Sequence, residues 1–397
     1  MSLTVKHLNT DASFLLTFQP LLPFPPTPGQ STTFTIVVDP WLSGPSNIFH
    51  PFFSSSKIKD AACISSLTEL PEPNLIIVSQ SKSDHCHKGT LTKLPKTGGK
   101  FIILAEPSAA KLIRSWKHFD ESQVVTLKEW SKPSKHTSSP NIHRIQLAAL
   151  TPRGEAGEVT VSLIKEGDTA GVKNAVAITY KAPTTGINQY PDLELPFTPP
   201  ASPRSYLSHS TTRTSPSSLS ILHAPHGISY THLKPFIATH LIQSASLPLT
   251  ALLHCFDRVQ NPWLLGGNIC TGAPSGMKIA EELMARCWIS AHDGDKVTKG
   301  VANRRIKITK WGRQEIEDVV SPRTPGFPER EGGCEVVMLG AGEERTIGGG
   351  MNWPSTRRDI GIPKSKSCWD MRGGEDDETD VEVESVRAES LNKFHAI

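Results

Sequence analysis

Three short apolar runs, each followed closely by histidine or aspartate, constrain the possible fold most. They are Leu75–Ser79 before Asp84 and His85, Leu219–Ala224 before His226, and Trp288–Ala291 before His292. A short continuous apolar run is typical of a strand that is buried on both faces of a sheet. Loops that leave the carboxyl ends of neighbouring strands meet at one edge of the sheet, so we expect these polar side chains to share one site.

The remaining periodicity predicts an α/β fold. The first fifty residues predict a β-meander, and the segment after it alternates strands with helices, which is typical of sheets covered by helices. The other predicted strands are Leu3–Leu8, Ser13–Phe18, Thr33–Val38, Lys100–Leu104, Val159–Ile164, Ala175–Tyr180 and Leu249–Cys255, and the main predicted helices are Ser108–Lys117 and Met277–Cys287.

The length of 397 residues allows one large domain or two ordinary ones. We assign residues 1–310 to the main domain, and residues 183–218, rich in Pro, Ser and Thr, to an inserted loop. Periodicity fades after Thr309, which leaves residues 311–397 as a C-terminal extension. Its acidic stretch Glu375–Glu389 has little to bury and is expected to be disordered.

The composition excludes some classes of protein. The chain has 42 Lys and Arg against 39 Asp and Glu, a net charge of +3 with both signs mixed, so we expect no nucleic-acid partner. The seven cysteines are an odd number without a Cys-x-x-Cys pair, which favours reduced thiols. No signal peptide and no apolar run of about 20 residues is found. We therefore expect a cytoplasmic protein without a transmembrane segment.

The strand-end residues indicate a metal site, with a plain alternative. Imidazole and carboxylate groups together suit zinc or a similar divalent ion. The chain has fifteen histidines, however, and a histidine at a strand end is more often a surface or hydrogen-bonding residue than a ligand. Spacing alone leaves both interpretations open.

Three segments, in this order, resemble the metallo-β-lactamase superfamily, over about residues 3–300. They are the turn Val38-Asp39-Pro40-Trp41-Leu42, the segment Gln80-Ser81-Lys82-Ser83-Asp84-His85 at the place of a His-x-His-x-Asp-His signature, and Ser290-Ala291-His292 at the place of the last metal-binding histidine. The chain is most similar to the branch related to sugar-phosphate lactonases and N-acyl phospholipid phosphodiesterases, and to fungal proteins with the same altered signature. The resemblance implies a four-layer αβ/βα sandwich.

The departures from the signature predict that one of two zinc sites is lost. Gln80 and Lys82 replace the first two histidines, and around Ile164–Val172 Asp168 is the only candidate for a third ligand. The second site keeps its aspartate and two histidines, and a further histidine stands where the family has a bridging aspartate. The expected ligands of a single zinc ion are Asp84, His85, His226 and His292.

The resemblance implies a mononuclear metal-dependent hydrolase that acts on an ester, lactone or phosphodiester of a small, anionic substrate. The metal would lower the pKa of a bound water toward about 7, and Asp293 or Asp295 is the candidate for proton transfer. The Lys82 ammonium could hold an anionic group or a developing oxyanion near the missing ion. Alternatively, Lys82 forms a salt bridge with Asp84 and the site is inactive.

Two other functional classes stay open. The chain could be a catalytically inactive scaffold or binding protein with the same fold, which the loss of three usual ligands favours. It could also be a metal-independent enzyme that uses Lys82 and His85 as an acid–base pair. Retention of Asp84, His85 and His292 together favours the metal-dependent enzyme.

Overall fold

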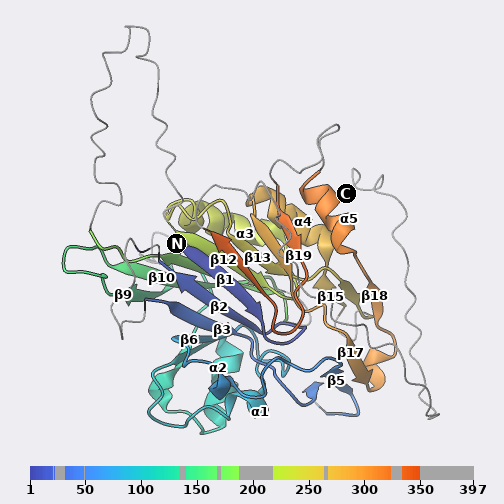
Figure 1. The fold of residues 1–397 in the computed structure, drawn as a ribbon. Helices are drawn as coiled ribbons and strands as arrows, with labels where there is room; N and C mark the ends of the chain where they lie inside the picture. Colours follow the sequence, from blue (N-terminus) through green and yellow to red (C-terminus); the bar gives the residue numbers. More distant parts are fainter. Residues whose placement is uncertain are drawn as a thin grey trace, which may run out of the picture.

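The computed structural model describes residues 1–20, 22, 32–48, 50–133, 140–167, 171–186, 218–262, 267–322 and 333–348. Two seven-stranded sheets pack face to face, with helices on both outer sides (Figure 1). The predicted four-layer sandwich is therefore confirmed. Most of the inserted loop, from 187 to 217, and the acidic tail lie outside the described residues.

The first sheet joins the N-terminal meander to a parallel half. Its order is β20 (Glu344–Gly348), β1 (Ser2–His7), β2 (Phe14–Gln19), β3 (Phe34–Val38), β6 (Leu75–Val78), β7 (Ile102–Ala105) and β8 (Val124–Thr126). Pairing is antiparallel from β20 to β3 and parallel from β3 to β8. The three meander strands lie within one residue of their predicted bounds.

The second sheet has the same division. Its order is β19 (Glu335–Val337), β16 (Cys287–Ser290), β13 (Ala251–His254), β12 (Leu219–Ala224), β11 (Asn174–Lys181), β10 (Gly157–Lys165) and β9 (His143–Leu147). Strands β12, β13, β16 and β19 are parallel, and the others pair antiparallel. The parallel halves contain β6, β12 and β16, the three runs that the site residues follow.

The position of strand β6 between two packed layers explains why its sequence is continuously apolar. Leu75 and Ile77 point into the core between the sheets, whereas Ile76 and Val78 pack under the helices of the outer side. The helices over this sheet are α1 (Lys88–Leu91) and α2 (Pro107–Ser115), and those over the second sheet are α3 (Tyr230–Phe236), α4 (Ala273–Glu282) and α5 (Arg313–Val320). Strands covered on both faces bury every side chain.

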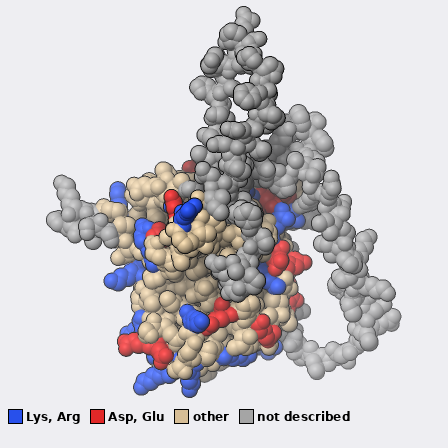
Figure 2. Space-filling model, turned by 60° about the vertical axis from the view of Figure 1, so that its left-hand side comes forward, with Lys and Arg blue, Asp and Glu red and all other residues tan. Residues whose placement is uncertain are grey.

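Short elements surround the sandwich. Two small sheets contain β4 (Ser46–Ile48), β5 (Ser54–Ile58) and β17 (Lys296–Lys299), and β14 (Arg258–Gln260), β15 (Asn268–Thr271) and β18 (Lys307–Thr309). Short helical turns are η1 (Leu67–Glu69), η2 (Glu121–Gln123), η3 (Ile237–Leu241) and η5 (Val301–Asn303). Within the described residues, every helix is too short or too polar to cross a membrane. Positive and negative side chains are interspersed on the face drawn in Figure 2.

The boundary that we expected at residue 310 does not coincide with the end of the sheets. Beyond it, α5 packs on the second sheet, β19 forms an edge of that sheet, and β20 pairs with β1 at an edge of the first. Both edge strands are short, and each has a single buried side chain, Val336 and Ile347. So few apolar residues produce no detectable period, which explains why the sequence suggested an extension there.

Candidate metal centre

The four predicted ligands meet at the carboxyl ends of β6, β12 and β16. Asp84, His85, His226 and His292 each present one ligand atom, and these atoms all lie within 4.8 Å of one another. His85 and His226 are buried, whereas Asp84 and His292 are partly exposed. The expectation that loops from neighbouring strands bring these side chains together agrees with this geometry.

Tight turns hold the ligands in place. After β6, the amides of His85 and Cys86 both donate to the carbonyl of Lys82. His226 lies in a turn closed by the amide of Gly227, which donates to Ala224. His292 has the left-handed backbone angle φ of +69°, a conformation that costs about 1–3 kcal/mol in a non-glycine residue and is concentrated at functional sites.

The distances between the ligand atoms fit a single divalent ion. His85 Nε2 lies 3.0 Å from His226 Nε2, and His292 Nε2 lies 3.3 Å from Asp84 Oδ2. Two imidazole nitrogens that bind one zinc ion at about 2 Å each lie roughly 3 Å apart. Among the described residues, the buried Asp84 Oδ1 has no hydrogen-bond partner, which leaves a carboxylate oxygen available to a cation.

Asp39, which directly follows β3, fixes the orientation of His85. Its carboxylate accepts hydrogen bonds from His85 Nδ1 at 2.8 Å, from His223 Nε2 at 2.9 Å, and from the amide and hydroxyl of Ser79 at 2.7 and 2.6 Å. Burial alone would raise the pKa of Asp39, but the charge of His85 and the hydrogen bonds from both histidines hold it far below its usual range. In its neutral form, His85 donates from Nδ1 to Asp39 and directs its Nε2 lone pair into the site.

The pKa values of the two remaining histidines are shifted in opposite directions. Burial, followed by repulsion from His292 and His85, places the pKa of His226 well below its usual value, so this ring is neutral, as metal binding requires. Burial would also lower the pKa of His292, but the charge of Asp11 and the hydrogen bond and charge of Asp84 raise it. The two carboxylates therefore make the His292 side of the cluster favourable for a positive charge.

The lysine in the cluster is Lys296, not the predicted Lys82. Lys296, the first residue of β17, places its Nζ 2.8 Å from Asp11 Oδ1 and 3.4 Å from His292 Nε2. Among the described residues, the Lys82 ammonium forms no hydrogen bond or ion pair, and the alternative salt bridge with Asp84 is not formed. The motif contains only Lys82, and nothing in the sequence shows which lysine side chain turns inward.

The two aspartates that we proposed for proton transfer lie outside the ligand cluster. Asp293 accepts hydrogen bonds from the amides of Phe256 and Asp257 and from the Ser290 hydroxyl, and burial raises its pKa to about 6. Asp295 is exposed and pairs with Lys310 at 3.5 Å. Asp293 thus ties the loop after β13 to the loop that carries His292, and proton transfer by either aspartate stays a prediction.

Sequence reasoning missed the residues that support the ligands, Asp11, Asp39, His223, Cys270 and Lys296. Asp39 carried a usable signal, because it follows the strand Thr33–Val38 just as the ligands follow theirs. Cys270 Sγ on β15 lies 3.5 Å from His226 Nδ1 and 4.0 Å from His292 Nδ1, behind both rings. The position of Asp168 lies outside the described residues.

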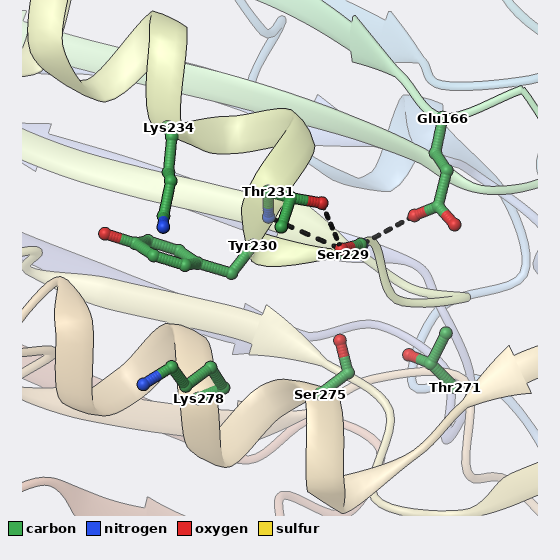
Figure 3. Close-up of a pocket in the computed structure, with 8 residues that line it drawn as sticks. All are labelled: Glu166, Ser229, Tyr230, Thr231, Lys234, Thr271, Ser275 and Lys278. Carbon is green, nitrogen blue, oxygen red and sulfur yellow. Dashed lines mark hydrogen bonds between the residues drawn. The ribbon is translucent and has the colours of Figure 1, made fainter. Parts of the chain in front are cut away.

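A separate surface cavity of about 340 Å³ lies between α3 and α4 (Figure 3). It is lined by Glu166, Ser229, Tyr230, Thr231, Lys234, Thr271, Ser275 and Lys278. The amide of Ser229 donates to Glu166 at 2.6 Å. Thr271 directly follows Cys270, so this cavity and the metal centre lie on two sides of the same strand end.

No protein-family model and no curated protein matches the chain. Solved structures align with 87% of it at low identity. They include a metallo hydrolase of Ignicoccus hospitalis (11% identity, TM-score 0.41, 98% of that chain), the isothiocyanate hydrolase of Delia radicum gut bacteria (12%, 0.44, 99%) and the metallo-beta-lactamase fold protein YhfI of Bacillus subtilis (12%, 0.40, 99%). These structural alignments are loose, so the site is described from the contacts within this chain alone.

Proposed function

We propose that the protein is a mononuclear metal-dependent hydrolase of an ester, lactone or phosphodiester bond in a small anionic substrate. The convergence of Asp84, His85, His226 and His292 to within 4.8 Å carries the proposal. Three imidazoles and one carboxylate form a ligand set that suits zinc. The neutral state of His226 and the fixed orientation of His85 support the same conclusion.

When bound, a divalent ion supplies Lewis acidity and acidifies a water molecule. The protein residues contribute orientation and charge. Asp39 keeps the Nε2 lone pair of His85 directed into the site. The side chains of Asp84 and Lys296 are 17% and 15% exposed, against 0% for His85, so substrate approaches from their side. There the Lys296 ammonium attracts an anionic group or stabilises a developing oxyanion.

Elemental analysis of protein purified without chelator tests the metal site. We expect about one equivalent of a transition metal in the wild type and its loss in His85→Ala. His232→Ala is the matched control, because this histidine is half-exposed on α3 and lies outside the cluster. Less than about a tenth of an equivalent in the wild type, with no change in His85→Ala, would contradict the proposal.

Hydrolysis assays then separate an enzyme from a metal-binding scaffold. Wild type and His292→Ala are compared on generic aryl esters and phosphodiesters, with His232→Ala again as the control. We expect turnover by the wild type and the control, and none by His292→Ala. Metal-loaded wild type that hydrolyses none of these substrates, yet loses its metal in His85→Ala, supports the scaffold alternative.

A further inference from the structure

Lys296 places an ammonium inside the candidate metal centre. Its Nζ lies 2.8 Å from Asp11 Oδ1, 3.4 Å from His292 Nε2 and 5.9 Å from the centre of the Trp41 ring. Asp11 is completely buried, and Lys296 is mostly buried. A carboxylate, an imidazole and an aromatic face thus surround this ammonium, and the carboxylate and the aromatic face favour its positive charge.

The same surroundings are those that a divalent ion requires. His292 Nε2 lies between two carboxylates, 3.3 Å from Asp84 Oδ2 and 3.9 Å from Asp11 Oδ2. Asp11 Oδ2 is buried and has no hydrogen-bond partner among the described residues. Because His292 Nε2 has a single lone pair and is assigned to the first ion, a second ion would bind here through carboxylate oxygens, from Asp11 and from Asp84 as a bridging ligand. Carboxylate oxygens are ligands of the kind that zinc or manganese binds.

We propose that the Lys296 ammonium occupies the position of a second cation and so limits this centre to one metal ion. The pair of Asp11 and Lys296 then supplies a fixed positive charge beside that ion, in place of a second ion. The proposal rests on the proposed function only in assigning the first ion to Asp84, His85, His226 and His292.

Charge repulsion provides the physical reason. An ammonium held against Asp11 by an ion pair at 2.8 Å repels a divalent ion that approaches the same carboxylates, and it cannot diffuse away because it is covalently attached. Removing its charge leaves Asp11 buried without a partner, an unfavourable state that a second metal ion would relieve. Lys82 provides a matched comparison, because it belongs to the same site region but forms no ion pair among the described residues.

Zinc titration of the chelator-treated full chain tests the proposal. Bound zinc is measured by elemental analysis after gel filtration, for the wild type and for Lys296→Met, Lys296→Gln and Lys82→Met. We expect one equivalent in the wild type and in Lys82→Met, and two in both Lys296 variants. The Gln variant keeps a hydrogen-bond donor for Asp11 without the charge, so it tests the proposal even if the Met variant does not fold. Adding Asp11→Asn to Lys296→Gln returns the stoichiometry to one.

The outcomes separate this inference from the proposed function. One equivalent of zinc in folded Lys296→Gln, or two in the wild type, overturns the role of Lys296. One equivalent of zinc in every variant contradicts the role of Lys296 but agrees with a mononuclear centre. A wild type that binds no zinc contradicts the proposed function itself, whatever the Lys296 variants bind.

Discussion

The segment Gln80–His85 after β6 has two halves, which differ in how completely their polar groups are hydrogen-bonded. In the second half, His85 is held by Asp39, whose carboxylate also accepts hydrogen bonds from His223 and Ser79. In the first half, Gln80 is only 2% exposed, and among the described residues both polar atoms of its amide lack a partner. Buried polar groups are normally hydrogen-bonded. The half with Asp84 and His85 is therefore an organised site. In the other half, burial of the unpaired Gln80 amide lowers the stability of the fold.

Asp39→Asn should have the largest effect, because it breaks the organised half. Asparagine tolerates the backbone angle φ of +45° at this position, so the variant removes charge and one acceptor while it keeps the turn. Leaving His85 and His223 buried without the carboxylate should lower the free energy of unfolding by about 3–5 kcal/mol and abolish metal binding. Urea unfolding and elemental analysis measure both effects. Asp295→Asn, at an exposed position, is the control and should change neither.

An unchanged metal content in folded Asp39→Asn would show that His85 is oriented without Asp39. Metal loss with unchanged stability would instead confine the role of Asp39 to the tautomer of His85. Because Asp39 is fully buried and hydrogen-bonded to two histidines, we expect both properties to change together.

Gln80→Met tests the first half and should have a smaller effect of the opposite sign. Replacing a buried, unpaired amide by an apolar side chain of similar size should raise the free energy of unfolding by about 1–2 kcal/mol. Gln123→Met is the matched control. Gln123 is also buried, but it accepts from the amide of Asp120 and donates to the carbonyl of Gly99, so its replacement should destabilise the protein. Equal destabilisation of both variants would mean that Gln80 has a partner after all.

The sequence predicted the parts of this molecule that depend on local pattern. Strands β6 and β12 were predictable because covering on both faces makes them continuously apolar. The positions at strand ends predicted that the polar side chains share one site, but the choice of four ligands came from the family resemblance. The pairing of Asp11 with Lys296 was not predictable, because it joins a turn after β1 to β17 through side-chain directions that no local pattern sets. The edge strands β19 and β20 were missed because each buries only one side chain.

A third prediction extends the comparison to two acids, the buried Asp39 and the partly buried Asp257, and has the smallest expected effect. Whereas the pKa of Asp39 is lowered, burial and then the charge of Asp293 raise the pKa of Asp257 from its ordinary value of 3.8 to about 7. Between pH 3.8 and about pH 7, the two pKa values of Asp257, the folded chain binds more protons at this residue than the unfolded chain does. The contribution of Asp257 to the free energy of unfolding therefore falls as the pH rises from about 4 to about 7.

Asp257→Asn removes this titration and keeps an oxygen that can accept the hydrogen bond from the amide of Trp311. The free energy of unfolding of the wild type minus that of the variant should decrease from about pH 5, through about pH 7, and level off roughly one pH unit above that. Urea unfolding at matched pH values gives this difference, in which the other titrating groups largely cancel. A difference that increases over this interval would mean that the folded state holds Asp257 charged, as it does Asp39, and that the two acids do not differ in the way that their surroundings indicate.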